Sequence, residues 1–156
     1  MHPNATAVSQ ALAAAGATGA VRELAESAKT AAAAAEALDC PVGAIANSLI
    51  FMADDAPVLV LTSGAHRVDT AYLAAQIGVA VLNRAAPEQV RAATGQPIGG
   101  VAPVGHPRPV RTLIDVALQD YPVVWAAGGT PHTVFPTTYD ELCRICMATP
   151  VAVVAP

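Results

Sequence analysis

The residues with the clearest capacity for chemistry are paired glycines rather than acids, bases or nucleophiles. Gly99 and Gly100 lie in the stretch Gln96–Pro107, which holds three glycines, three prolines and one histidine. A second pair, Gly128-Gly129, follows the apolar run Val123–Ala127. Because glycine permits positive φ and a close approach to the main chain, such pairs beside strands can direct bare N–H groups at a ligand. We therefore predict that the two glycine bends face each other across one pocket.

Backbone donors of this kind are suited to binding a carbonyl oxygen or the oxyanion that forms from it. We predict this role for Gly99 and Gly100, since losing one such donor typically costs about 3–4 kcal/mol of barrier. A β-bulge that only turns the chain is the alternative. Gly128 and Gly129 are predicted to form the floor of the pocket, unless they only mark the end of a strand.

The stretch 96–107 is expected to be ordered, although proline and glycine prevent it from forming an amphipathic helix. Ile98, Val101 and Val104 recur at every third residue and are predicted to be buried.

Few polar side chains near these bends point to side-chain catalysis. His106 and His132 could each bond to a ribose or to water. Alternatively, His106 could have a structural role and His132 could lie in a surface loop. Neither has a Cys or His partner at metal-ligand spacing, so we expect no metal. Asn47 could be a simple cap between a helix and a strand. Ser48 has no neighbouring base and no G-x-S-x-G elbow, which argues against a serine hydrolase.

Length and composition favour one domain over residues 1–156, with a net charge of −4 that argues mildly against a broad nucleic-acid surface. The chain has neither an apolar run long enough to span a bilayer nor a signal-peptide pattern at Met1, so we expect a cytoplasmic protein. Three cysteines give no disulfide framework. Cys143 and Cys146 are predicted to pack on the buried face of a helix, with redox or metal chemistry as the alternative.

Strand hairpins mixed with helices predict an α+β or mixed α/β domain, with a central mixed sheet or partly open barrel flanked by helices. Asn4 or Thr6 is expected to cap a first helix that stops at Gly16. Trp125 is expected in the core and Arg67 in a surface ion pair. Helices are predicted at Ala31–Leu38 (capped by Thr30), Asp69–Ile77, Pro87–Arg91 and Tyr139–Cys146, a helical turn at 40–46, and strands at Val21–Leu24, Ser48–Ala53, Pro57–Thr62, part of Arg111–Leu118, Val123–Ala127, Thr133–Phe135 and Val151–Val154.

Taken in order, these segments resemble the YbaK/EbsC family, the editing domains associated with prolyl-tRNA synthetase, over nearly the whole chain. The residues that carry the resemblance are Cys40-Pro41-Val42-Gly43-Ala44-Ile45, Ser48-Leu49-Ile50-Phe51, Arg67-Val68-Asp69, Ile98-Gly99-Gly100-Val101-Ala102-Pro103-Val104-Gly105 and Ala127-Gly128-Gly129-Thr130-Pro131-His132. The glycine signature after a strand–turn–strand is the specific part.

The resemblance implies an aminoacyl-tRNA deacylase that removes Cys, Ala or a similar small amino acid from tRNA for proline. It implies that no cofactor is needed. It also implies that the attacking group is either a water positioned with the tRNA 2′-hydroxyl or the thiol of a cysteine substrate. The acceptor end of an aminoacyl-tRNA, and prolyl-tRNA synthetase, are the implied partners. On this reading Asn47, Gly99 and Gly100 are the catalytic candidates, and the substrate-binding candidates are Ser48, Gly105, His106, Gly128, Gly129 and His132.

Asn47 departs from the family pattern, because the family usually has a lysine at this position. Asparagine is a neutral donor and acceptor that cannot hold a phosphate as a point charge. Lys29 is distant in sequence and is not expected to substitute. The alternative function is therefore a catalytically weak module that binds a tRNA end or an aminoacyl nucleotide. The oligomeric state and the amino acid removed stay open.

Overall fold

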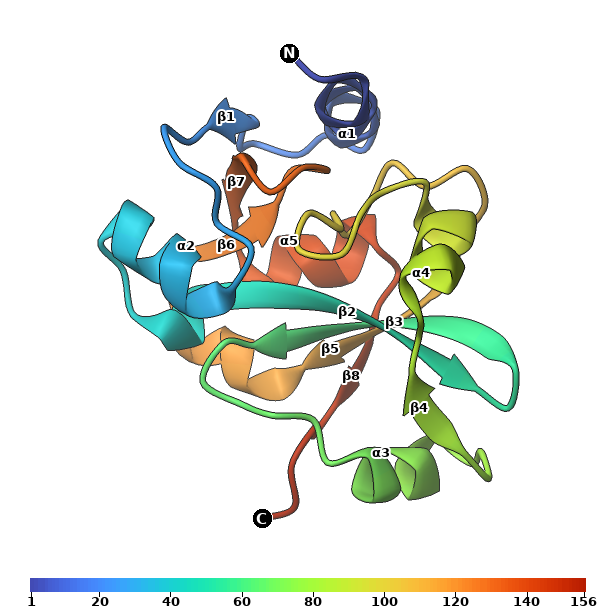
Figure 1. Ribbon diagram of the computed structural model, residues 1–156. Helices are drawn as coiled ribbons and strands as arrows, with labels where there is room; N and C mark the ends of the chain where they lie inside the picture. Colours follow the sequence, from blue (N-terminus) through green and yellow to red (C-terminus); the bar gives the residue numbers. More distant parts are fainter.

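The computed structural model, which describes all residues 1–156, contains an eight-stranded mixed sheet with five helices around it (Figure 1). The strands follow the order β1-β7-β6-β2-β3-β5-β8, and β4 pairs with β2 outside this path. The predicted mixed α/β architecture is confirmed; the sheet path has two ends, so it is not a closed barrel. The strands are β1 (Arg22–Glu23), β2 (Ile45–Ala53), β3 (Ala56–Ser63), β4 (Leu82–Arg84), β5 (Arg111–Asp115), β6 (Val124–Ala127), β7 (Thr133–Thr137) and β8 (Thr149–Val151).

The helices cover the sheet at separate places. In Figure 1, α1 lies beside β1 and β7 at the end of the molecule with the N-terminus, while α3 lies near the C-terminus at the other end. No helix is both long and apolar enough to cross a bilayer. The helices are α1 (Pro3–Ala14), α2 (Ala31–Leu38), α3 (Thr70–Ile77), α4 (Pro87–Thr94) and α5 (Tyr139–Ile145), with 3₁₀ turns η1 (Val42–Ala44) and η2 (Val116–Asp120).

The hairpin of β2 and β3 is the centre of the sheet. Eight antiparallel residue pairs join the two strands, from Ala46 with Ser63 to Ala53 with Ala56, and Asp54 and Asp55 take positive φ in the turn. The strand begins at Ile45, so the predicted helical turn over Ile45 and Ala46 is wrong. The reason is long-range, because these two residues pair in parallel with Trp125 and Ala126 of β6.

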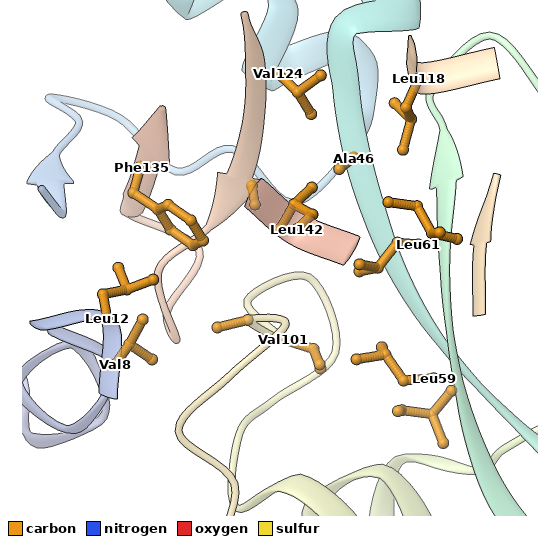
Figure 2. Close-up of a cluster of buried hydrophobic side chains, with 14 of the residues drawn as sticks. Val8, Leu12, Ala46, Leu59, Leu61, Val101, Leu118, Val124, Phe135 and Leu142 are labelled. Carbon is orange, nitrogen blue, oxygen red and sulfur yellow. The ribbon is translucent and has the colours of Figure 1, made fainter. Parts of the chain in front are cut away.

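Successive residues of a strand point to opposite faces of a sheet, and the two faces of the hairpin bury different cores. Leu59 and Leu61 belong to the larger core, and Val58 and Val60 to the other core, together with Leu73 of α3. Figure 2 shows the larger core, where Val101 lies between the side chains of α1 and those of β3.

Local sequence signals set most of the helix ends. Thr30 accepts a hydrogen bond from the Ala33 N–H and caps α2, Asp69 caps α3 in the same way, and Gly78 ends α3 at φ 74°. For α1 the expected cap is wrong, because the His2 side chain accepts from the Asn4 N–H and α1 begins at Pro3. The last strand is β8 at Thr149–Val151, earlier than predicted, where it pairs with β5.

The C-x-x-C pair lies on α5, as predicted. Cys143 and Cys146 are half-buried and pack against the larger core. Burial in apolar surroundings raises the pKa of the Cys146 thiol to about 12. The Cys146 thiol is therefore uncharged at neutral pH, as the packing interpretation requires.

Candidate functional site

Strand β2 positions the candidate site because it carries two different sets of side chains. Ala46 and Ile50 point toward the larger core, so Ser48 between them faces the same side. Phe51 and Ala53 belong to the other core, which places Asn47 and Leu49 on the opposite side. Adjacent residues of one strand thus reach two faces of the sheet.

A small cavity of about 40 Å³ lies where β2 and β6 meet α2 and the loop 96–107. Most of its wall consists of small or apolar side chains, and no acid takes part. On this measure one water molecule needs about 10–15 Å³, so the cavity has room for a small group of atoms. Its lining is Ala28, Lys29, Thr30, Ala31, Ala34, Ile45, Ala46, Asn47, Ser48, Gly99, Val101, Trp125, Ala126, Ala127, Thr133 and Val134.

Ser48 is the most informative side chain of this wall. Its Oγ is buried, and it is the one buried side-chain oxygen or nitrogen of the protein with no hydrogen-bond partner. An unsatisfied buried hydroxyl costs about 1–3 kcal/mol. Because Ser48 also lines the cavity, a turn of its side chain would bring the hydroxyl to a ligand there.

Gly99 brings main chain to the same wall. It has φ 88°, and a Cβ at this position would lie 3.3 Å from the Cβ of Lys29. The Gly99 N–H makes no hydrogen bond within the protein. A donor is therefore available at the cavity wall, and any larger residue at 99 would be strained and would press on Lys29.

Lys29 lines the cavity, although it was not expected to take the place of the family lysine. It lies beside Gly99 and lines the cavity together with Asn47, although 18 residues separate it from Asn47 along the chain. The Lys29 side chain is exposed and takes part in no ion pair, since the protein has only two ion pairs and both lie elsewhere. The one cation that lines the cavity thus comes from the turn before α2.

Gly100 does not line the cavity. Its N–H donates to the Pro97 carbonyl at 3.0 Å. A Cβ on Gly100 would lie 2.6–2.8 Å from backbone atoms of Thr130 and Pro131. The two glycine-containing bends therefore meet in direct contact, and the predicted cleft between them is wrong.

Gly128, Gly129 and His132 also lie outside the cavity wall. The Gly128 N–H donates to the Thr133 carbonyl, and a Cβ on Gly129 would approach Asn4 and Val8 of α1. The His132 side chain is exposed, and its N–H donates to the Thr130 hydroxyl. The structure thus places this bend under α1, and the predicted pocket floor is formed instead by Ala126 and Ala127.

The loop 96–107 is ordered by a buried glutamine. The Gln96 side chain is 2% exposed, accepts from the Ala102 N–H at 2.8 Å and donates to the Val104 carbonyl at 3.4 Å. Val101 is buried as predicted, whereas Ile98 is 47% exposed, so the expected burial of Ile98 is wrong. The sequence signal for Gln96 was weak, because an isolated glutamine is usually exposed.

His106 and Gly105 belong to the support of this loop rather than to the cavity. The His106 Nε2 contacts the Ala102 carbonyl at 2.7 Å, and burial lowers the pKa of His106, with the carbonyl contact opposing the shift. A Cβ on Gly105, which has φ 83°, would approach Val8. His106 thus braces the loop internally, and Gly105 lets the loop pack closely against α1.

Trp125 is half-buried rather than in the core as predicted. Its ring lines the cavity on one side, and the guanidinium of Arg22 lies 4.5 Å from the ring centroid. The tryptophan thus closes one wall of the cavity while remaining partly accessible.

A wider groove of about 220 Å³ adjoins the cavity and shares seven of its lining residues, among them Asn47, Ser48 and Gly99. Ile98 and Arg84 belong to the groove but not to the cavity. No acidic side chain lines the groove, and nowhere in the protein do three His, Cys, Asp or Glu side chains gather in a way that could hold a metal ion. The structure thus brings Asn47, Ser48, Gly99 and Lys29 together.

Comparisons with known proteins point in one direction. The model of the aminoacyl-tRNA editing domain matches residues 25–145. The proline–tRNA ligase of Levilactobacillus brevis is 35% identical over 85 residues, which cover 54% of this chain and 15% of the ligase. The ligase of Lactobacillus acidophilus is 32% identical over 98 residues, 62% of this chain and 17% of the ligase. The chain therefore spans less than a fifth of the length of these curated relatives.

Two solved structures are similar over the whole chain. A crystal structure of a protein proposed to be a trans-editing enzyme for prolyl-tRNA synthetase has 40% sequence identity and a TM-score of 0.91, covering 100% of this chain and 99% of that chain. A structure from work on grafting linear epitopes onto scaffold proteins has 37% identity and a TM-score of 0.93, with full coverage of both chains.

Proposed function

The chain belongs to the aminoacyl-tRNA editing domain family, and from this premise we propose that it is a trans-acting deacylase of mischarged tRNA for proline. The proposed substrates carry alanine, cysteine or serine on the terminal ribose. The observation that supports this best is a cavity of about 40 Å³ with an alanine-rich wall, an unpartnered Ser48 hydroxyl and an unpaired Gly99 N–H.

Cavity size gives the proposal its logic. A synthetase pocket built for proline rejects smaller side chains weakly, since one methylene is worth about 1–3 kcal/mol. A second site can instead hydrolyse whatever is small enough to enter. A methyl, hydroxymethyl or sulfanylmethyl group suits the space bounded by Ala31, Ala34 and Ala46, and we expect the closed ring of proline to be excluded by its shape.

In the proposed reaction, a water oxygen attacks the carbonyl carbon of the ester that joins the amino acid to the terminal ribose. The ester C–O bond breaks, the ribose oxygen takes up a proton, and the free amino acid and uncharged tRNA leave. The Gly99 N–H would stabilise the negative charge on the carbonyl oxygen, and the Ser48 hydroxyl would hold the acyl group. The terminal adenosine would lie in the wider groove, next to the exposed Ile98 and under the charge of Lys29.

Incubation with tRNA for proline charged with alanine, cysteine or serine tests this proposal, with prolyl-tRNA as the matched control. We expect loss of the three small esters and survival of the prolyl ester. If none of the three is hydrolysed above the rate in buffer, the deacylase proposal fails.

The second candidate is a binding module of the same fold with weak or no turnover. Asn47, the neutral residue at the family lysine position, favours it, because the only cation in the cavity wall is then the exposed Lys29. Titration of the protein with a non-hydrolysable aminoacyl-adenosine analogue separates the two candidates. Tight binding without turnover of any charged tRNA would select the binding module.

A further inference from the structure

A second hollow, of about 390 Å³, lies on the opposite side of β2 from the cavity. Asn47 belongs to its wall and to the wall of the cavity, and Arg84 belongs both to the hollow and to the wider groove. The cavity, the groove and the hollow therefore share lining residues along β2, and we refer to the three together as the path. We name the hollow the basic hollow after His66, Arg67 and Arg84, which line it.

The charge of this hollow is opposite to that of the protein. The chain has a net charge of −4, yet no acidic side chain lines the hollow. Arg67 and Arg84 make no ion pair, so the predicted surface ion pair of Arg67 is wrong. Two uncompensated guanidinium groups that line one hollow attract an anion, and their planar forks suit phosphate oxygens.

His66 is held in place from behind. Its Nδ1 lies 2.8 Å from Oδ2 of Asp115, a residue that is 1% exposed. The same carboxylate accepts from the N–H groups of Ser63 and Ala117, both at 3.0 Å. This fixes the imidazole with Nε2 as its free nitrogen, and the His66 side chain remains 30% exposed at the hollow.

Arg84 is also restrained before any ligand binds. Its guanidinium lies 5.7 Å from the centroid of the Phe51 ring, a cation–π contact from strand β4 to strand β2. A side chain that is already oriented loses less conformational entropy when it binds a phosphate.

We propose that the basic hollow binds a backbone phosphate of the acceptor strand of the RNA whose 3′ end enters the cavity. This rests on the proposed function, because the ester at the 3′ end must lie in the cavity while the strand leaves through the groove. The groove leads to Arg84, and from Arg84 the strand reaches Arg67 and His66. Sequence-independent affinity for RNA comes mainly from such phosphate contacts.

The test uses the full chain, an uncharged RNA hairpin that ends in single-stranded CCA, and the double variant Arg67→Gln/Arg84→Gln. We expect the dissociation constant to rise about tenfold to a hundredfold, as for the loss of charged hydrogen bonds. The slope of log K against log salt should become shallower by about 0.7, the contribution of one phosphate of a single strand.

The matched control is Arg108→Gln/Arg111→Gln, which removes the same charge from two exposed arginines outside all three parts of the path. We expect its affinity and salt slope to stay close to those of the wild type. Equal losses in both double variants would mean that only net charge matters, and no loss in either would mean that the hollow binds no RNA; both results overturn the proposal. Titration with AMP is a further control. If Arg67→Gln/Arg84→Gln loses affinity for AMP but not for the hairpin, the hollow binds a free nucleotide, and the proposal is overturned.

This experiment is independent of turnover. A wild type that binds the hairpin through Arg67 and Arg84 but hydrolyses no charged tRNA would refute the deacylase and keep the phosphate site. If the wild type hydrolyses alanyl-tRNA but both double variants bind the hairpin equally well, the deacylase proposal stands and the phosphate site is refuted.

Discussion

The two faces of β2 differ in almost every property that matters for binding. The face with Ser48 borders a cavity of about 40 Å³ with small, mostly apolar walls, whereas the face with Asn47 opens on a hollow of about 390 Å³ with three basic side chains. The first suits selection by size and the second suits attraction by charge. Because strand residues alternate between faces, one short segment can contribute to both without a compromise between them.

The strongest way to break this comparison is to fill the cavity and leave the hollow unchanged. Ala34 is 7% exposed in the cavity wall, and Ala34→Leu adds three carbon atoms there. We expect deacylation of alanyl-tRNA to fall about tenfold to a hundredfold, the equivalent of about 1–3 kcal/mol of overpacking. The affinity for the uncharged hairpin should stay within about twofold of the wild-type value, because phosphate contacts dominate RNA affinity. A parallel loss of RNA affinity would contradict the division between the faces.

Ser48→Ala sharpens the comparison, because it should move stability and activity in opposite directions. Removing a buried hydroxyl without a partner should raise the free energy of unfolding by up to about 1 kcal/mol. Removing the same group from the acyl site should slow deacylation about two- to tenfold, the value of one neutral hydrogen bond. Chemical denaturation and single-turnover rates measure the two effects.

The matched control is Ser27→Ala, since Ser27 is exposed and lies outside the cavity. If Ser48→Ala destabilises the protein, its hydroxyl has a partner within the fold and is not available to substrate.

Asn47→Lys adds a charge on the side of the hollow. We expect tighter hairpin binding and a salt slope steeper by about 0.7, the contribution of one further phosphate contact. Asn83→Lys is the matched control, because Asn83 is exposed on β4 and outside the path. Equal effects of the two substitutions, or none, would show that Asn47 does not face the bound RNA.

His106 gives the smallest effect and tests the support of the loop. Burial lowers the pKa of His106, so the unfolded chain binds a proton more readily than the folded chain. Stability should therefore decrease as the pH falls through the usual histidine value of about 6.5 and level off below the folded value. Denaturation midpoints between pH 5 and pH 8 measure this slope, and His106→Gln should flatten it.

Sequence patterns predicted those parts of the fold that depend on near neighbours. Thr30 and Asp69 cap their helices as expected, and the β2–β3 hairpin has the predicted turn. The start of β2 was missed because its partner Trp125 lies 80 residues away along the chain. Strand β4 was missed because it has three residues and pairs only at the edge of β2.

The candidate site was predictable only in part, for the same physical reason. Gly99 and Ser48 were found from motifs along the chain, and both line the cavity. The contact between Gly100 and Thr130, which closes the expected cleft, depends on how two distant bends pack. Lys29 and Arg84 reach the path from segments far from the motifs, so no spacing rule could have selected them.

One series of rates tests the central claim most directly: deacylation of tRNA for proline charged in turn with alanine, serine, cysteine, valine and proline. If the cavity beside Ser48 sorts acyl groups by size and shape, the first three esters are hydrolysed well above the rate in buffer and the last two are not. Hydrolysis of the prolyl ester at a rate similar to that of the alanyl ester would contradict the account.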